Sequence, residues 1–163
     1  MKDSTCTIVG PNPSKLSAQI DYHKLTQALE KEILTAISAG YTIFQSSMAM
    51  GVDIIAAEIV HKLKREFPHI RLHFYLPCET QANNWSEHWR ERYFNLCANA
   101  DDVFCLQKSY SNGCMNRCYR AMVDCSSRLI AVYDGVTAGN MVYIVRYAKK
   151  KSLDIILINP LDF

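Results

Sequence analysis

Residues 44–53, which read FQSSMAMGVD, join the end of a predicted strand to the start of a predicted helix. Small residues fill the turn, and a glycine allows another group to approach the backbone closely. The first backbone N–H groups of a helix have no partner within it and lie at the positive end of its dipole, so they favour an anion such as phosphate. The alternative is an ordinary turn capped by a serine. The expected ligand contacts here are Ser46, Ser47, Met48, Gly51 and Asp53.

On both sides of this turn, short apolar runs alternate with segments of helical spacing. Thr5–Val9 is β-branched and stops at Gly10, and apolar residues then recur at helical intervals until Gly40. The same unit repeats to the end of the chain. Strands are predicted at residues 5–9, 41–44, 70–76, 102–106, 129–133 and 153–158, and helices at 21–39, 52–63, 85–96, 115–125 and 141–150.

Strands that lack strict alternation and are separated by helices indicate a parallel sheet covered on both faces. We therefore predict a single Rossmann-like, doubly wound α/β domain over residues 1–163, with about six strands in a mainly parallel sheet. Ligands of such sheets bind beyond the carboxyl ends of the strands. The loops that follow strands are where a site is expected, and the first of them contributes Gly10 and Asn12.

Composition narrows the class of protein. The 163 residues contain 18 Lys and Arg against 16 Asp and Glu, and 49% are hydrophobic, which argues against a disordered chain and against a dedicated duplex-DNA binder. No apolar run reaches the roughly 20 residues that span a bilayer. The first residues do not resemble a signal peptide, and the number of cysteines, seven, is odd, which favours reduced thiols over a disulfide framework. We therefore expect a cytoplasmic protein with no membrane partner.

Two further loops carry polar residues that a ligand would need. Residues 133–140 hold two glycines, a threonine and an Asn cap before a helix, and Asp134 there is suited to ribose hydroxyls. Residues 77–85 form a polar loop in which Trp85 either stacks on a base or packs, and Asn84 is the expected cap of the next helix. Neither a P-loop nor a dinucleotide fingerprint occurs. The expected contacts are Asp134, Gly135, Thr137, Gly139 and Asn140 in one loop, with Glu79 and Gln81 in the other.

These segments, taken in order, resemble the YpsA-like branch of the SLOG superfamily. The matching motifs run from about residue 5 to residue 158 and include residues 7–13, 47–58, 77–85, 114–117, 122–124, 129–135 and 146–148. The resemblance implies a Rossmann-like fold and a pocket for a nucleotide or nucleotide-derived ligand such as AMP, ADP-ribose or NAD, in a sensor or regulatory protein. It implies no established reaction, and no other cofactor is expected. Related branches are the LOG-type phosphoribohydrolases and the DprA-type single-strand DNA binders.

The chain departs from the family pattern at three places. Close relatives usually have Gly-His-Arg-Pro where residues 10–13 read GPNP, so a ring and a cation are missing. Ser47 stands where a glycine is usual, and residues 138–140 replace a Gly-Gly-Thr. Loss of a charge-assisted hydrogen bond removes on the order of 1.5–3 kcal/mol, so the ligand or its affinity can differ from that of relatives.

Three alternatives stay open. Glu58 is the one candidate catalytic acid, and the alternative role is a solvated helix glutamate; a LOG-like hydrolase motif is absent. Cys114 and Cys118, with Cys78, lack the spacing of a structural zinc site, so no metal is predicted, and the cysteines at 6, 97, 105 and 125 are expected in the core. A nucleic-acid rim would draw on Arg90, Arg92, Arg117, Arg120 and Arg128 with Tyr110 and Tyr119. We expect solvated helix faces instead, and leave a homodimer or a regulatory protein partner open.

Overall fold

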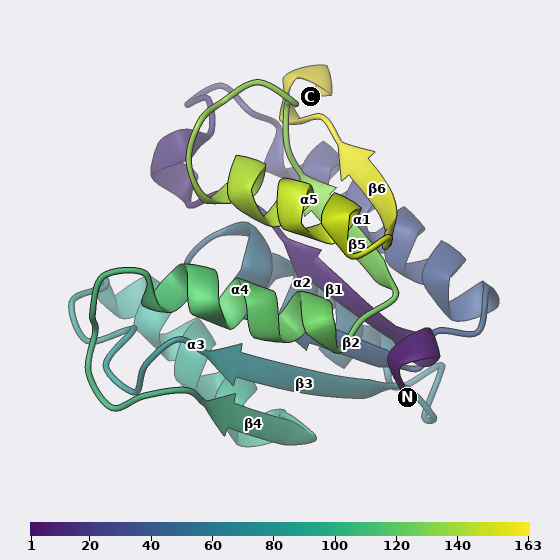
Figure 1. Ribbon diagram of the computed structural model, residues 1–163, viewed down its shortest axis with the longest axis horizontal. Coiled ribbons are helices and arrows are strands. Elements are labelled where there is room, and N and C mark those ends of the chain that lie inside the picture. The colour runs from purple at the N-terminus through teal and green to yellow at the C-terminus, as the bar shows by residue number, and fades with distance from the viewer.

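The computed structural model describes all 163 residues and consists of one six-stranded sheet between two layers of helices (Figure 1). All strand pairs are parallel, in the order β4-β3-β2-β1-β5-β6. The predicted doubly wound α/β fold is confirmed. The strands are β1 (Thr5–Val9), β2 (Ile43–Ser46), β3 (Arg71–Leu76), β4 (Asp102–Cys105), β5 (Arg128–Val132) and β6 (Asp154–Ile158).

Helices α1, α2 and α3 cover one face of the sheet, and α4 and α5 cover the other (Figure 1). Their bounds are α1 (Tyr22–Ser38), α2 (Val52–Leu63), α3 (Glu87–Asn99), α4 (Cys114–Asp124) and α5 (Asn140–Lys150), with short 3-10 turns η1 (Lys2–Ser4), η2 (Pro13–Lys15) and η3 (Pro160–Asp162). None of these helices combines the length and the apolar character that crossing a bilayer requires.

Two element boundaries differ from the predictions for reasons that local hydrogen bonds explain. Strand β2 starts two residues late because Tyr41 N still donates to Ala36 O, at 3.0 Å, and so completes the end of α1 around Gly40. Helix α3 starts at Glu87 and is preceded by Ser86, so the predicted cap at Asn84 is wrong. Residues 80–85 wind instead through turns closed by main-chain bonds such as Trp85 N to Ala82 O, at 3.2 Å.

A separate apolar cluster lies on each side of the sheet. The larger cluster joins the sheet to α1, α2 and α3 and includes the fully buried Phe44 and Phe74, and the smaller one lies beneath α4 and α5. Cys6 belongs to the core as expected, whereas Cys105 and Cys125 are exposed, which corrects the prediction for both. Cys105 lies on the edge strand β4 and Cys125 caps the end of α4, so neither is covered by another element.

A buried polar cluster fixes α4 to the middle of the sheet. Thr7 Oγ1 lies 2.8 Å from Gln45 Oε1 and 2.6 Å from Ser126 Oγ, and Ser126 Oγ donates to Met122 O at 2.7 Å. Thr7, Gln45 and Ser126 are all buried. Buried polar groups are expensive unless they are hydrogen-bonded, so this cluster specifies where the end of α4 meets β1 and β2.

The strand order places a crevice beside β1. From β1 the chain builds β2, β3 and β4 on one side, and it then returns to build β5 and β6 on the other. The connection after β1 leads to α1 on one face, and the connection after β5 leads to α5 on the opposite face (Figure 1). Two loops that diverge in this way leave room at the carboxyl ends of their strands, which is where ligands bind in open α/β sheets.

Candidate functional site

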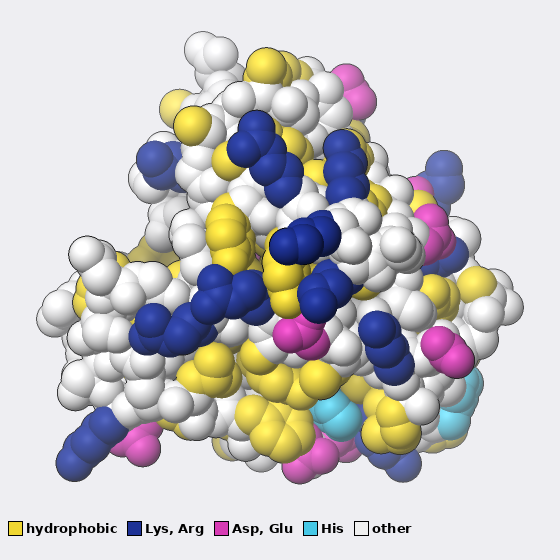
Figure 2. Space-filling model, in the orientation of Figure 1, with side chains coloured by type: hydrophobic (Ala, Val, Ile, Leu, Met, Phe, Trp, Pro, Cys, Tyr) yellow, Lys and Arg dark blue, Asp and Glu magenta, His cyan; other side chains and the backbone are white.

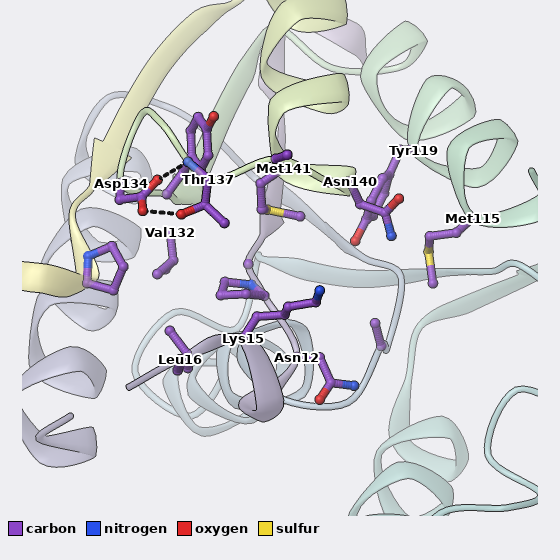
Figure 3. A pocket seen from close by; sticks show the side chains of 17 residues that line it. Asn12, Lys15, Leu16, Met115, Tyr119, Val132, Asp134, Thr137, Asn140 and Met141 are labelled. Atoms are coloured by element: carbon purple, nitrogen blue, oxygen red, sulfur yellow. Dashed lines mark hydrogen bonds between the residues drawn. The ribbon is translucent and has the colours of Figure 1, made fainter. Parts of the chain in front are cut away.

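A pocket of about 220 Å³ lies at this switch point (Figure 3). Six segments build it: the loop after β1, the turn after β2, the first half of α4, the end of β5 with the loop that follows it, the start of α5, and the residue at which η3 begins. The lining residues are Gly10, Pro11, Asn12, Lys15, Leu16, Ala49, Met115, Tyr119, Val132, Tyr133, Asp134, Thr137, Ala138, Gly139, Asn140, Met141 and Pro160.

The pocket brings together part of the predicted site. Gly10 and Asn12 from the first loop meet Asp134, Thr137, Gly139 and Asn140 from the β5–α5 loop. Gly135 belongs to the same loop but is not among the lining residues. The turn after β2 reaches the pocket only through Ala49, so the anion site predicted at residues 46–53 is not where the cavity lies.

The start of α5 supplies unpaired backbone donors to the pocket. Gly139 precedes the helix with φ 125°, and no side chain caps the first turn. Asn140 and Met141, the first two residues of α5, both line the cavity. The N–H groups of a first helical turn have no partner within the helix, so an acceptor in the pocket would meet them together with the positive end of the helix dipole.

Asp134 shapes the loop that leads into α5. Its carboxylate accepts a hydrogen bond from Val136 N at 2.9 Å. It also accepts one from Thr137 N, at 2.8 Å, and one from Thr137 Oγ1 (Figure 3). These hydrogen bonds lower the pKa of Asp134, and the bond from the Thr137 side chain has the largest effect. The carboxylate is therefore ionised at neutral pH and already accepts three hydrogen bonds, and its contact with ribose stays a prediction.

Lys15 is the only Lys or Arg among the lining residues, and the sequence pattern did not single it out. It belongs to η2, the turn that Asn12 caps by accepting a hydrogen bond from Ser14 N at 3.1 Å. The exposed Lys15 side chain makes no ion pair and extends into the pocket from the loop after β1 (Figure 3). Lys15 thus supplies a cation to the loop in which Pro11-Asn12 replaces the His-Arg of the family pattern. Only the 3-10 turn, which directs position 15 toward the cavity, would have pointed to it.

Asp53 joins the two loops instead of facing the cavity. Its Oδ1 accepts from Gly10 N at 2.9 Å and its Oδ2 accepts from Ser47 Oγ, while Ser46 Oγ donates to Asp53 O at 2.9 Å. The side chain is fully buried, and burial raises the pKa of Asp53 to about 7. The side-chain oxygens of both serines also accept the main-chain N–H groups of Met48 and Ala49. All these polar groups are used within the protein, so their expected role as ligand contacts stays a prediction.

Gly51 is required by the packing of the two loops. Its φ is 102°, and a Cβ at this position would lie 2.7 Å from Pro11 O and 2.8 Å from Pro13 Cδ. A side chain at Gly51 would therefore collide with the loop after β1, and would disturb the pocket by displacing that wall. The groups that lie against Gly51 belong to the protein's own first loop, and the predicted approach of a ligand to Gly51 stays a prediction.

The remaining predicted residues lie outside the pocket. Glu79 is exposed, and Gln81 Nε2 donates to Ser47 O at 3.1 Å. Trp85 packs against the larger apolar cluster with its ring centroid 5.3 Å from that of Tyr93, which favours the packing role. Glu58 binds Arg92 through two hydrogen bonds of 3.1 and 2.5 Å, in a groove between α1, α2 and α3.

The cysteines and arginines do not assemble into the other sites considered. Cys114, Cys118 and Cys78 are buried, and no three Cys, His, Asp or Glu side chains are placed to hold a metal ion. The five arginines do not share one rim. Arg92 faces Glu58. Arg128 is the first residue of β5, at the opposite end of that strand from the pocket, and pairs with Asp154. Tyr119 is buried and lines the pocket instead.

Comparison with known proteins agrees with this architecture. The chain is similar to the DNA processing protein A of Helicobacter pylori, described as having a unique single-stranded DNA binding mode. The TM-score is 0.63 at 16% identity, over 99% of this chain and 71% of that one, so the likeness concerns the fold. In sequence, the chain is 34% identical to a UPF0398 protein of Halalkalibacterium halodurans over 144 residues, covering 85% of this chain and 76% of the relative.

A UPF0398 protein of Bacillus cereus is 33% identical over 129 residues, which is 78% of this chain and 70% of the relative. The family model for YpsA, described as the YspA SLOG family, matches residues 15–162 and so covers the sheet from β2 to β6 together with all five helices. The chain belongs to the YpsA family of SLOG proteins.

Proposed function

We propose that this protein binds a small phosphate-bearing ligand derived from a nucleotide, such as AMP, ADP-ribose or NAD, in the switch-point pocket. The observation that carries the proposal is the meeting of an unpaired ammonium group, that of Lys15, with the uncapped first turn of α5 across one cavity. Proteins hold phosphate both with cationic side chains and with the N-termini of helices.

The size and lining of the pocket indicate how such a ligand would lie. The volume of about 220 Å³ is below the roughly 300–1,000 Å³ that encloses a drug-sized molecule, so part of a nucleotide would stay outside. Lys15, Asn12 and Asn140 form a polar part suited to phosphate and sugar. Leu16 and Pro160 offer apolar surface to a less polar part of the ligand.

Binding without chemistry is favoured over catalysis. Asp134 is the only carboxylate that lines the pocket, and its oxygens already accept three hydrogen bonds. Glu58, the sequence-based candidate for an acid, is held by Arg92 in a different groove. A sensor or regulatory protein that responds to its ligand needs only the binding step.

Calorimetric titration and thermal-shift measurements with AMP, ADP-ribose, NAD and cyclic nucleotides test this proposal. We expect at least one of them to bind and to raise the melting temperature. Lys15→Met should weaken that binding by roughly 10- to 100-fold, because a charge-assisted hydrogen bond contributes about 1.5–3 kcal/mol. Lys31→Met, which removes an exposed lysine of α1 that does not line the pocket, is the matched control.

The H. pylori neighbour is described by its binding of single-stranded DNA, and a DNA strand carries the same phosphate chemistry. Oligothymidylate is therefore included as a further probe. Binding of the oligonucleotide with no mononucleotide binding, or no stabilisation by any nucleotide in a folded sample, contradicts the proposal. Release of free base from nucleoside monophosphates would favour the LOG-like hydrolase instead.

A further inference from the structure

Strand β4, at the edge of the sheet opposite β6, is unusually exposed to solvent. All four residues of β4 are exposed, whereas β1 and β2 are buried throughout. Ten large apolar or aromatic side chains of the whole chain are exposed, and four of them fall within residues 103–110. They are Val103, Phe104, Leu106 and Tyr110, at 43%, 42%, 38% and 70%. Apolar surface gathers along the lower rim in Figure 2, over the region that β3 and β4 occupy in Figure 1.

Apolar side chains occur on both faces of this strand. Phe104 lies on the α4 face, with its ring centroid 4.9 Å from that of Tyr75 and 6.0 Å from that of His73. Neighbouring residues of a strand point to opposite faces, so Val103 and Cys105 lie on the other. No strand pairs with the outer side of β4, which leaves a row of N–H and C=O groups without strand partners. Proteins usually protect such an edge with Pro, charged side chains or a bulge; residues 103–107 carry no Pro and no charge, and the charged residues Asp102 and Lys108 flank them.

We infer that β4 is the contact surface for a second copy of this chain, paired antiparallel across a two-fold axis so that the two sheets become continuous. β4 ends at Cys105, but the chain stays beside the end of β3 for two more residues, since Leu106 N donates to Leu76 O and Glu79 N donates to Gln107 O. When the pairing extends past β4 to Lys108, residues 102–108, which read DVFCLQK, are complementary to themselves. With Cys105 on the axis, Phe104 faces the partner's Leu106 and Asp102 faces the partner's Lys108. Each ion pair then occurs twice, as two-fold symmetry requires.

The neighbouring register is less favourable. With Phe104 on the axis, Asp102 would face the partner's Leu106, and a carboxylate would meet an apolar side chain. Opposite charges and apolar pairs that lie directly across two strands stabilise their pairing, whereas mismatched pairs do not. The charges at the two ends of the segment therefore favour both the second copy as occupant and the register with Cys105 on the axis.

This inference does not depend on the proposed function. The pocket lies at β1 and β5, and no residue of β4 lines it. Substitutions on β4 can therefore be read through the oligomeric state alone, with ligand binding as a check that the rest of the protein is unaffected.

Sedimentation equilibrium over a range of concentrations is the first measurement. We expect a dimer of the full chain, and we expect Phe104→Glu to make it monomeric without changing the circular dichroism spectrum. Leu157→Glu, on the opposite edge strand β6 and 48% exposed, is the matched control and should stay dimeric. A monomer at every concentration, or a dimer that persists in Phe104→Glu, overturns the inference; so does a dimer lost only in Leu157→Glu.

Charge reversal tests the register. Asp102→Lys and Lys108→Asp should each weaken dimerisation by roughly tenfold, which corresponds to about 1.4 kcal/mol. The double variant should restore it, because each new charge meets its new opposite on the partner. Failure of the double variant to recover overturns the register.

Cross-linking of the wild-type chain gives a second readout that does not depend on whether the Phe104 and charge variants fold. Cα atoms directly opposite in an antiparallel pair lie roughly 4.5–5.5 Å apart, within the range of roughly 4.4–6.8 Å that a disulfide bridges. Copper–phenanthroline oxidation should therefore link two copies through Cys105. The link should disappear in Cys105→Ser and remain in Cys125→Ser, the other exposed cysteine. A link that depends on Cys125 instead would place the contact elsewhere.

Discussion

The buried carboxyl of Asp53 makes a prediction about stability and pH. It is fully buried, and it holds Gly10 of the first loop and Ser47 of the second at once. Burial raises the pKa of Asp53 from its ordinary 3.8 to about 7, against the smaller opposing effect of its hydrogen bonds. Since each pKa unit corresponds to about 1.36 kcal/mol, the shift amounts to roughly 4 kcal/mol of folding free energy.

The sign follows from proton binding. Between about pH 4 and pH 7 the folded protein keeps a proton on Asp53 that the unfolded chain has already lost, so the free energy of unfolding falls as the pH rises through this window. Below it both states are protonated, and above it both are ionised. The stabilisation is therefore complete in acid and is lost by about pH 7.

Asp53→Asn removes this titration while keeping the shape of the side chain. The amide oxygen can still accept from Gly10 N, and the amide N–H₂ can donate to Ser47 Oγ. Urea unfolding at several pH values measures the free energy of unfolding of both proteins. We expect the free energy of unfolding of the variant, relative to that of the wild type, to rise by up to roughly 4 kcal/mol between about pH 4 and pH 8.

Because the wild type and Asp53→Asn share every other titratable group, the effects of those groups on stability largely cancel when the two proteins are compared at the same pH. His73 is present in both proteins, and Asp101 and Asp134 have lowered pKa values, so they titrate in more acid solution. Asp162→Asn, in the exposed C-terminal turn, controls for the loss of one negative charge. A difference between Asp53→Asn and wild type that does not change with pH would refute the reasoning, because it would mean that Asp53 has the same pKa folded and unfolded.

Three further predictions concern single residues. Gly51→Ala should destabilise more than Gly40→Ala in thermal unfolding: the φ values are 102° and 100°, but only at Gly51 would the Cβ meet backbone, 2.7 Å from Pro11 O. Thr7→Val should cost roughly 1–3 kcal/mol in denaturant unfolding, because it leaves Gln45 and Ser126 with one partner fewer in a buried cluster. Glu58→Gln should change stability by no more than about 1 kcal/mol and leave nucleotide affinity unchanged in calorimetry, since its half-exposed ion pair with Arg92 lies outside the pocket.

Much of the fold was predictable because its signals are local. Helical spacing of apolar residues and the glycine after α1 predicted α1 closely, and β-branched runs predicted the strands to within a few residues. The errors occurred where hydrogen bonds between residues a few positions apart, which the spacing of apolar residues does not show, decide a boundary. Tyr41 completes a helix instead of starting a strand, and the turns at residues 80–85 delay α3 until Glu87.

The candidate site was predictable only in part, for a related reason. Gly10, Asn12 and the β5–α5 loop reach the pocket because the carboxyl ends of parallel strands lie together at one end of the sheet. Ser46, Ser47 and Asp53 have the residue types of an anion site, yet their polar groups are directed at one another and at Gly10. Residue type shows what a side chain can bind, but it does not show which partner lies nearest.

The sequence by itself determined the class of fold, the family, and the loops in which a ligand site was expected, because these follow from periodicity and from motifs along the chain. The tertiary structure alone decided that Lys15 replaces the missing cation of the first loop, that Asp53 joins two loops, and that β4 is left bare at the edge. These properties depend on contacts between residues far apart in the sequence, and on which strand comes last in the sheet. Neither is encoded in the spacing of neighbouring residues.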